Sequence, residues 1–414
     1  MRVIILTQHY KPEPLPKAHE LAEGLAVRGH QVTVITGFPN YPTGRLYDGY
    51  RIRPWTVQTI DGVRVVRLAL YPDHSASALR RLANYGSFMA MAAVLGPIFA
   101  GPADAMFVIH PPLTIAIPAY VIGRLRHVPY VFAVGDLWPE AIVAAGMLRE
   151  GLPVRMLRRL ARFAYRHAAV VAPVTSAIGE HLAAAGVPRA RLRVIPDWVD
   201  EVLYRPLPPD PALAAQLGVA GRFTVMFAGQ IGIVQHLSTV VEAAALLGDH
   251  PDVRFVIVGD GVDRARLIRD VEARRLTNIT FPGQRPPEEM PRLLALADVL
   301  LVHLSGDPIF RLSVPAKVYA YMACGKPILA ALDGAGAEVV RAAGAGLVCP
   351  PAQPRALADA VLEFRRLSVA TRQEMGRRAR EVFLGRYARR VVLDQCEALL
   401  ARVARDRRQA VTES

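Results

Sequence analysis

The chain of 414 residues is poor in lysine, cysteine and acidic side chains. Only four of its 50 basic residues are lysines, and 50 Lys and Arg against 36 Asp and Glu give a formal charge of +14. The three cysteines, Cys324, Cys349 and Cys396, are too few for a disulfide scaffold and indicate a reducing compartment. Because hydrophobic residues make up 52% and charged residues 21% of the chain, a disordered protein is not expected.

Several familiar catalytic and ligand-binding motifs are also missing. The chain contains no Asp-x-Asp, no Cys or His pair at zinc spacing, no Walker A lysine loop and no Gly-x-Ser-x-Gly elbow. We therefore expect neither a metal nor a cofactor. The basic charge is compatible with nucleic acid, anionic lipid or phosphorylated substrates, but no nucleic-acid module is recognisable.

Short apolar runs alternate with amphipathic helical stretches, which is typical of α/β proteins with parallel sheets. The first unit of this pattern has a strand at Arg2–Thr7, a helix at Lys17–Arg28 and a strand at Gln31–Thr36. Further strands in the first half are predicted at Val63–Leu68, Ala105–Ile109, Tyr130–Val134, Val170–Pro173 and Leu192–Ile195. Those of the second half are predicted at Thr224–Ala228, Arg254–Val258, Asn278–Phe281, Val299–His303, Pro327–Ala331 and Gly346–Cys349.

A proline-rich segment interrupts this alternation. Residues 201–211 hold four prolines and are interpreted as a hinge. We predict an N-terminal domain at 1–200, a C-terminal domain at 212–385 and a C-terminal helix and tail at 386–414. The expected fold class is α/β with two doubly wound, Rossmann-like domains that face a central cleft and bind ligands beyond the carboxyl ends of their strands.

Two segments indicate a membrane surface. From Leu82 to Ala103 the chain has 22 residues without a formal charge, but three glycines and two prolines interrupt the run. We expect a buried or membrane-dipping helix there rather than a true span. In Pro153–Ala168, one helical face carries Arg155, Arg158, Arg159 and Arg162. That face suits an anionic membrane, and a solvated face of a packed helix is the alternative.

Two glycine-rich turns follow predicted strands in the second half. Gly229 and Gly232 lie in the first turn, and Gly259 lies in Val258-Gly-Asp-Gly261 after the next strand. Glycine lets the backbone approach a ligand closely, and a helix N-terminus behind it offers unpaired N–H groups. These features suit a diphosphate, although a plain strand-to-helix turn explains the same residues.

Lys317 provides the most specific single-residue argument. Pro315 suits the first turn of a helix and so places Lys317 in that turn as well. A cation there is unfavourable with the helix dipole, and an anionic ligand would remove the penalty. The alternative is a solvated surface lysine, because exposed charge–dipole energies are small.

In the first half, His110, Asp136 and Glu140 follow predicted strands at the edge where a ligand is expected. The carboxylates could receive sugar hydroxyls or act as a base, and Trp138 could stack on a sugar face. An Asx-type turn, a core aromatic and a structural histidine are the alternatives.

Several motifs, in order, resemble the family 4 retaining glycosyltransferases of the GT-B fold. The resemblance runs from the first strand to about residue 385, and it is closest to the bacterial colanic-acid and O-antigen branch, which is similar to L-fucosamine transferases. The matching segments are Gly37–Gly44, Asp136–Glu140, Val194–Pro206, Val258–Gly261, Val314–Lys317 and Ala323–Ile328. It implies that two Rossmann-like domains enclose a nucleotide-sugar and that C-terminal helices return to the N-terminal domain.

The chain departs from this family at the donor site. The wider family carries two glutamates eight residues apart, and Leu312 and Ala320 take those positions here. By the same resemblance, Lys317 with Arg311 supplies the missing cation, and the N–H groups of Ile231–Ile233 complete the diphosphate site. Donor binding is thus expected from Gly229, Gln230, Gly232, Gly259, Gln284, Arg311, Ser313, Val314 and Lys317, and catalysis from Lys317, Asp136, Glu140 and His110.

We therefore expect a metal-independent glycosyltransferase attached to the cytoplasmic face of the inner membrane. It would move a sugar from a nucleotide donor, with UDP as the expected nucleotide, to a polyprenyl-diphosphate-linked saccharide of the cell envelope. Retention of configuration is implied by the resemblance alone. Two alternatives stay open, a UDP-sugar epimerase or phosphorylase on the same fold and a non-catalytic nucleotide-sugar-binding membrane scaffold.

Overall fold

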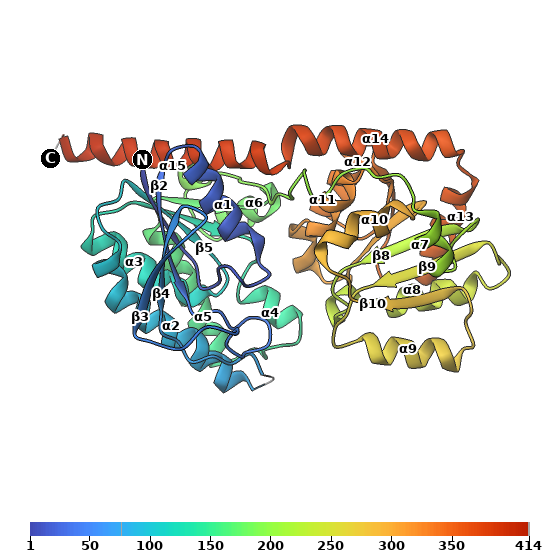
Figure 1. Ribbon diagram of the computed structural model, residues 1–414, viewed down its shortest axis with the longest axis horizontal. Coiled ribbons are helices and arrows are strands. Elements are labelled where there is room, and N and C mark those ends of the chain that lie inside the picture. The colour runs from blue at the N-terminus through green and yellow to red at the C-terminus, as the bar shows by residue number, and fades with distance from the viewer. Residues whose placement is uncertain (76, 413–414) are drawn as a thin grey trace. The chain divides into compact units, whose positions relative to one another are not determined.

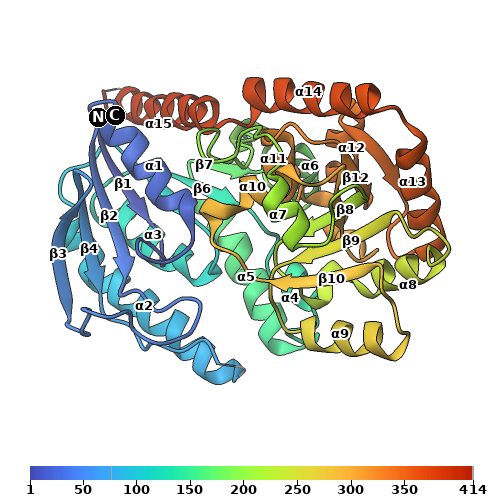
Figure 2. The ribbon, with the colours of Figure 1, turned by 45° about the vertical axis from the view of Figure 1, so that its right-hand side comes forward.

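The computed structural model describes residues 1–75 and 77–412 (Figure 1). It divides into two compact units. The first unit comprises residues 1–196 and the chain from Leu393 onward, and the second comprises residues 197–392. Each unit holds one sheet with helices packed on it, as Figure 2 shows from a second direction. The predicted α/β class with two Rossmann-like units is confirmed.

The first unit is built on a seven-stranded sheet in the order β3-β4-β2-β1-β5-β6-β7. Its central strands are parallel, and their aliphatic side chains are almost fully buried because helices cover both faces. The strands are β1 Arg2–Leu6, β2 Gln31–Gly37, β3 Trp55–Ile60, β4 Val63–Leu68, β5 Ala105–Ile109, β6 Tyr130–Val134 and β7 Val170–Pro173. The helices are α1 Pro16–Val27, α2 Ala78–Phe99, α3 Ala116–Leu125, α4 Glu140–Ala144, α5 Leu152–His167 and α6 Ser176–Ala184.

Two elements of this sheet differ from the sequence prediction. β3 was not predicted, because its side chains alternate between exposed and half-buried and form no apolar run. It pairs antiparallel with β4 across Asp61 and Gly62, which have φ of 50° and 77°. An Asp-Gly pair with two positive φ angles is a hairpin turn, and that dipeptide was the available signal. The predicted strand Leu192–Ile195 is wrong, since it forms only a single bridge, Leu192 to Val171, before Pro196 ends it.

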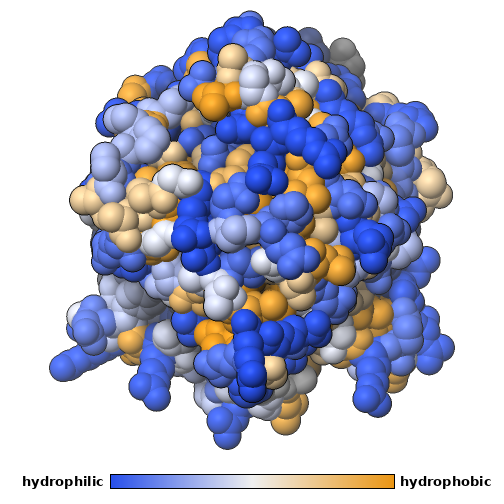
Figure 3. Space-filling model, turned by 90° about the vertical axis from the view of Figure 1, so that its right-hand side faces the viewer, coloured by the Kyte–Doolittle hydropathy of each residue, from blue (hydrophilic) through white to orange (hydrophobic). Residues whose placement is uncertain are grey.

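The second unit is built on a six-stranded parallel sheet in the order β10-β9-β8-β11-β12-β13. The strands are β8 Phe223–Ala228, β9 Val253–Val258, β10 Ile279–Gly283, β11 Val299–His303, β12 Ile328–Ala331 and β13 Gly346–Cys349. The helices are α7 Pro211–Gln216, α8 Ser238–Leu246, α9 Arg264–Ala273, α10 Met290–Ala295, α11 Ala316–Ala323, α12 Ala335–Ala342, α13 Pro354–Arg366 and α14 Val369–Arg386. Figure 3 shows a face of this unit that is mostly hydrophilic, with apolar residues scattered over it.

The last helix, α15 (Arg389–Thr412), packs on the first unit from Leu393 onward. Arg28 at the end of α1 pairs with Asp394 at 2.6 Å and with Glu397 at 2.8 Å. Cys396 on the same helix is fully buried. The C-terminal helix therefore returns to the N-terminal sheet, as the family resemblance implies.

Helix α2 is the one segment among the described residues that is long and apolar enough to cross a membrane. Leu79–Phe99 has a mean hydropathy of 1.4 over its most apolar window, and 28% of that window is buried. Length and composition alone do not separate a membrane helix from a core helix.

Two glycines of α14 should respond in opposite ways to the same substitution. A Cβ on Gly376 would lie 2.0 Å from the carbonyl oxygen of Gly325, whereas a Cβ on Gly385 meets nothing within 4 Å. We expect Gly376→Ala to lower the free energy of unfolding by roughly 1–3 kcal/mol through overpacking. Gly385→Ala should raise it by about 0.5–1 kcal/mol through helix propensity. Thermal unfolding of both variants tests this, and equal shifts would refute the close approach of α14 to Gly325.

Candidate active site

Three glycines bring the carboxyl ends of β8, β9 and β10 into backbone contact. Gly229 follows β8 and Gly259 follows β9, each with φ near 137°. The Gly259 N–H donates to the carbonyl oxygen of Gly283 at 3.0 Å, at the end of β10. A Cβ on Gly259 would lie 1.9 Å from the Gly229 oxygen, so no larger residue fits between these turns. The edge of the sheet is therefore lined by main chain rather than by side chains.

Lys317 reaches this edge from the first turn of α11, where Pro315 is the N-cap residue. Its Nζ lies 3.6 Å from the centroid of the Phe227 ring in β8. The same atom is 3.3 Å from where a Cβ on Gly229 would stand. A side chain at position 229 would therefore crowd the ammonium, and glycine keeps that space open.

The Lys317 ammonium is enclosed without a hydrogen-bond partner among the described residues. Desolvation by burial lowers the pKa of Lys317 to about 7. Lys317 lies in the first helical turn, as predicted. The alternative of a solvated surface lysine does not apply, because Lys317 Nζ is enclosed. A buried cation beside open backbone is a site prepared for an anion.

The backbone donors predicted at Ile231–Ile233 are only partly free. The Ile231 N–H donates to the Asp260 oxygen at 2.8 Å, and the Gly232 N–H donates to Gln235 Oε1 at 3.1 Å. Gly232 precedes a short 3-10 turn, Ile233–Gln235, and α8 begins only at Ser238. The expectation of a helix N-terminus with three free donors directly behind the glycine turn is therefore wrong.

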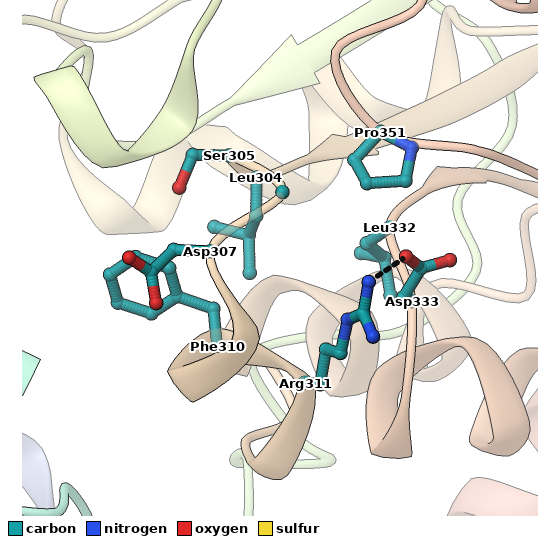
Figure 4. Close-up of a pocket in the computed structure, with 9 residues that line it drawn as sticks. Leu304, Ser305, Asp307, Phe310, Arg311, Leu332, Asp333 and Pro351 are labelled. Carbon is teal, nitrogen blue, oxygen red and sulfur yellow. Dashed lines mark ion pairs between the residues drawn. The ribbon is translucent and has the colours of Figure 1, made fainter. Parts of the chain in front are cut away.

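Arg311 does not provide the second free cation that was expected. Its guanidinium pairs with Asp333 at 3.3 Å in a small pocket lined also by Asp307 and Phe310 (Figure 4). The charge of Arg311 is therefore compensated by a neighbouring carboxylate. Lys317 has neither an ion pair nor a hydrogen-bond partner at this edge among the described residues.

The other predicted donor residues occupy the same edge in different ways. Gln230 and Gln284 are exposed where β8 and β10 end. Ser313 is half-buried between the 3-10 turn Pro308–Leu312 and α11, and Val314 is buried in the core. Val314 thus supports the position of α11 rather than presenting a polar atom.

Two histidines of this region were missed by the sequence analysis. His303, the last residue of β11, is fully buried, and its Nδ1 lies 2.8 Å from the Gln235 carbonyl oxygen. That bond requires Nδ1 to carry the proton, so Nε2 is an acceptor, and it has no partner among the described atoms. Burial lowers the pKa of His303 to about 4. The ring of His236 stacks on that of His303, with 6.3 Å between the ring centroids. The position of His303 at a predicted strand end was the available signal.

In the first unit, the predicted residues His110, Asp136 and Glu140 follow β5 and β6. His110 packs against Phe132 at 5.9 Å and Trp138 at 5.7 Å between ring centroids. Burial lowers the pKa of His110 to about 3, so the ring is neutral. Asp136 is exposed.

Glu140 and Arg158, predicted for different roles, form an ion pair at 3.0 Å. Arg158 also pairs with Glu150 at 2.6 Å, so its charge is compensated by two carboxylates. The expectation that Arg158 faces a membrane as a free cation is therefore wrong. Arg155, Arg159 and Arg162 are exposed on the same helix.

A buried carboxylate, Glu13, organises the loops after β1 and β2 and was not singled out from the sequence. Its oxygens accept hydrogen bonds from the backbone N–H groups of Tyr10 at 3.0 Å, Asn40 at 2.9 Å and Tyr41 at 2.8 Å. Burial alone would raise the pKa of Glu13, but the His9 ring and these N–H groups outweigh it and lower the pKa. Glu13 thereby holds the predicted loop Gly37–Gly44 in place.

Two Rossmann-like units, the second with glycine turns around a buried lysine, define a protein of the GT-B fold class. Residues 16–198 match the model of the glycosyl transferase 4-like domain. Residues 212–382 match the model of the glycosyl transferases group 1. The chain belongs to the group 1 glycosyltransferase family.

Two curated relatives and one solved structure illustrate this membership. WcaI of Escherichia coli (strain K12), a glycosyl transferase named for colanic acid biosynthesis, is 26% identical over 73% of this chain and 76% of its own length. The glycosyltransferase WbjE of Pseudomonas aeruginosa is 30% identical over 65% of this chain and 67% of its own length. HepE of Anabaena, solved with UDP and glucose, has a TM-score of 0.71 at 18% identity, covering 97% of this chain and 99% of its own, and shares the fold.

Removing the charge of Lys317 should stabilise the free protein. Lys317→Met keeps an unbranched side chain on the Phe227 ring and removes a buried group without a partner, whose burial costs about 1–3 kcal/mol. The lysine pKa is about 7 in the folded state. The pKa of lysine is about 10.4 in the unfolded chain. The loss of folding stability from burying the charged Lys317 is therefore complete below pH 7 and declines as the pH rises toward 10. We therefore expect a rise in the unfolding midpoint that is largest near pH 6.

Lys326→Met is the matched control for that measurement. The Lys326 ammonium donates to the carbonyl oxygens of Ala295 at 2.6 Å and Ala297 at 2.8 Å. Its removal leaves two acceptors unpaired and should lower the midpoint. A folded Lys317→Met protein that is less stable than the wild type at pH 6 would contradict the unpaired state of Lys317.

Proposed function

We propose that this glycosyltransferase moves a sugar from a UDP-sugar to a lipid-linked saccharide during assembly of a cell-envelope polysaccharide. We further propose that it does so with retention of configuration and without a metal. The single observation that carries the donor assignment is the buried, unpartnered Lys317 ammonium beside the Gly229 turn.

A diphosphate is the anion that suits this ammonium. A phosphate oxygen beside Nζ would supply the missing counter-charge, and the open backbone at Gly229 and Gly259 leaves room for a bulky anion. The Phe227 ring stabilises the cation from the other side. Neutral His303 adds an acceptor nearby, which suits a hydroxyl group rather than a phosphate oxygen.

The choice of UDP and of an envelope acceptor draws on the relatives. HepE was solved with UDP and glucose, and WcaI is named for colanic acid biosynthesis. The acceptor is assigned to the first unit, where the exposed Asp136 carboxylate would receive hydroxyls and Glu140, held by Arg158, would orient them.

In this proposal the bond between the anomeric carbon and the diphosphate oxygen breaks, and the acceptor hydroxyl oxygen forms the new bond to that carbon. The hydroxyl proton passes to the leaving diphosphate. Negative charge grows on the leaving group in the transition state, so Lys317 stabilises the transition state more than the bound donor. Charge stabilisation is thereby assigned to Lys317 and to main-chain dipoles. Among residues 1–75 and 77–412, no three His, Cys, Asp or Glu side chains gather as metal ligands.

A transfer assay tests the proposal directly. The full chain is incubated with a panel of UDP-sugars and short lipid-diphosphate saccharides, with and without EDTA, and products are read by mass spectrometry. We expect a mass increase of one sugar on the acceptor from at least one donor, unaffected by EDTA. Turnover of the free UDP-sugar without an acceptor would favour an epimerase or phosphorylase, and a lack of UDP binding would favour a scaffold.

Lys317→Met should lower kcat/KM at least about tenfold, since a charge-assisted contact contributes roughly 1.5–3 kcal/mol. Lys326 lies in the same unit and donates to two carbonyl oxygens. Folded Lys326→Met should therefore retain the kcat/KM of the wild type. Unchanged kinetics in folded Lys317→Met would remove Lys317 from the mechanism.

Donor binding should take up a proton in alkaline buffer. The free Lys317 amine has a pKa of about 7 and is mostly neutral at pH 8.5. A bound diphosphate favours the charged form and raises that pKa, while UDP itself is fully ionised because the second pKa of a phosphate monoester is about 6. We expect uptake of about one proton per UDP at pH 8.5 and little at pH 6. Calorimetry in buffers of different ionisation enthalpy measures it, and undiminished uptake by Lys317→Met would assign the proton elsewhere.

A further inference from the structure

Helix α2 exposes apolar side chains along its whole length. The exposed fractions are 76% for Leu79, 58% for Leu82, 68% for Val94 and 67% for Ile98. Ala83 and Ala90 are exposed between them, and the spacing of 82, 90, 94 and 98 places these residues on one face of the helix. We call these six residues the α2 stripe. No charged side chain interrupts it between Leu82 and Ile98.

Two polar side chains of the same helix, Asn84 and Ser87, make hydrogen bonds with the rest of the protein. Asn84 is fully buried and binds the Gln8 amide at 2.6 Å, the Asn40 side chain at 3.1 Å and the Tyr71 carbonyl oxygen at 2.7 Å. Ser87 accepts a hydrogen bond from the Tyr71 N–H at 2.8 Å. These bonds fix the rotation of α2, so the stripe cannot turn inward without breaking a buried polar network.

The arginines around the stripe outnumber the carboxylates that pair with them: Arg80 lies 3.9 Å from Asp73, and Arg158 pairs with Glu140 and Glu150. Helices α2, α3 and α5 lie side by side, α3 touching both of the others, and together they hold eight arginines and no acidic residue. Arg80 stands exposed at the start of α2, and Arg155, Arg159 and Arg162 are exposed on α5. At the other end of the stripe, Trp55 is 49% exposed and its ring lies 5.6 Å from Phe99.

The exposed apolar side chains and the neighbouring arginines together favour an anionic lipid surface as the partner of the stripe. A second copy of the chain would bring the same arginines face to face, whereas an anionic lipid surface offers both acyl chains and negative headgroups. A spanning orientation is unsuitable, because the inner side of α2 is committed to the protein through Asn84. Tryptophan is typical of the interfacial level of a bilayer.

We propose that α2 lies in the interface of an anionic bilayer, with the α2 stripe among the acyl chains and the exposed Arg155, Arg159 and Arg162 of α5 at the headgroups. The orientation goes beyond the proposed transfer reaction and does not depend on the donor site. It places the first unit, to which acceptor binding is assigned, at the surface where a lipid-linked saccharide resides. The apolar contact of the stripe is not screened by salt, unlike the contact of the α5 arginines with the headgroups.

Vesicle binding tests this proposal. The full chain is mixed with vesicles of phosphatidylcholine alone and of equimolar phosphatidylcholine and phosphatidylglycerol, and binding is measured by flotation. We expect binding to the anionic vesicles that high salt weakens but does not abolish. Brominated acyl chains should quench tryptophan fluorescence, and Trp55→Phe should remove that quenching.

A matched pair of valines provides the decisive variants. Val94→Asp alters the stripe. Val27→Asp alters α1, which lies on the other side of the sheet (Figures 1 and 2). Val27 is 88% exposed. Both positions are exposed, so both variants should fold. Val94→Asp, and more so Val94→Asp with Ile98→Asp, should weaken vesicle binding at least about tenfold, whereas Val27→Asp should not.

A charge variant separates the headgroup contact from the apolar one. Arg159→Glu with Arg162→Glu should weaken binding to anionic vesicles and reduce its salt dependence. Equal binding by wild type and Val94→Asp, or absence of wild-type binding, would overturn the proposal. So would a wild-type dimer that Val94→Asp dissociates. UDP calorimetry on the same samples keeps the two proposals distinct, because a failure of membrane docking leaves UDP binding by the second unit intact.

Discussion

The Lys317 ammonium lies against the face of the Phe227 ring, enclosed and without a hydrogen-bond partner among the described residues. Several elements of the second unit meet at this atom. α11 presents the lysine in its first turn, β8 supplies the ring, and glycines at 229 and 259 keep the backbone close and the space beside Nζ open. A buried cation without an anion lowers the stability of the free protein. Under the proposed function, a bound diphosphate would supply the missing counter-charge and so offset that loss of stability.

The same edge shows how a site keeps one charge available by neutralising its neighbours. Arg311 is paired with Asp333, and the Ile231 and Gly232 N–H groups are bonded within their own turns. In the first unit, Arg158 is held by Glu140 and Glu150, and Glu13 is held by three N–H groups. Paired groups hold loops in position, whereas the unpaired lysine is free to respond to a ligand.

Helix α2 buries a polar side chain and exposes a row of apolar ones. Asn84 is inside with Phe88 and Ala92 and is bonded to Gln8 and Asn40, whereas the stripe residues are outside. The inner face is satisfied by hydrogen bonds, whereas the outer face leaves aliphatic side chains exposed. The second unit thus has a buried cation without a counter-ion among the described residues, Lys317, and the first unit has an exposed apolar surface, the α2 stripe.

Most of the architecture follows from local sequence. Alternating apolar runs and helical stretches predicted twelve of the thirteen strands, and the Pro315 argument placed Lys317 correctly, because periodicity and helix capping act over a few residues. β3 was missed because an edge strand with one solvated face has no apolar run, and Leu192–Ile195 was wrongly predicted because an apolar run before a proline resembles a strand.

What only the tertiary structure decided is which charges have partners and which faces are covered. The partners of Arg311 and Arg158 come from 22 and 18 residues away in the chain, and those of Asn84 from 76 and 44. Sequence reasoning treats each of these groups by itself, so it counted paired arginines as free and an inward-facing asparagine as part of an apolar run. Family, fold class and the first-turn position of Lys317 could be inferred from residues and spacing alone. Pairing and exposure depend on contacts between distant segments, which exist only after the chain has folded.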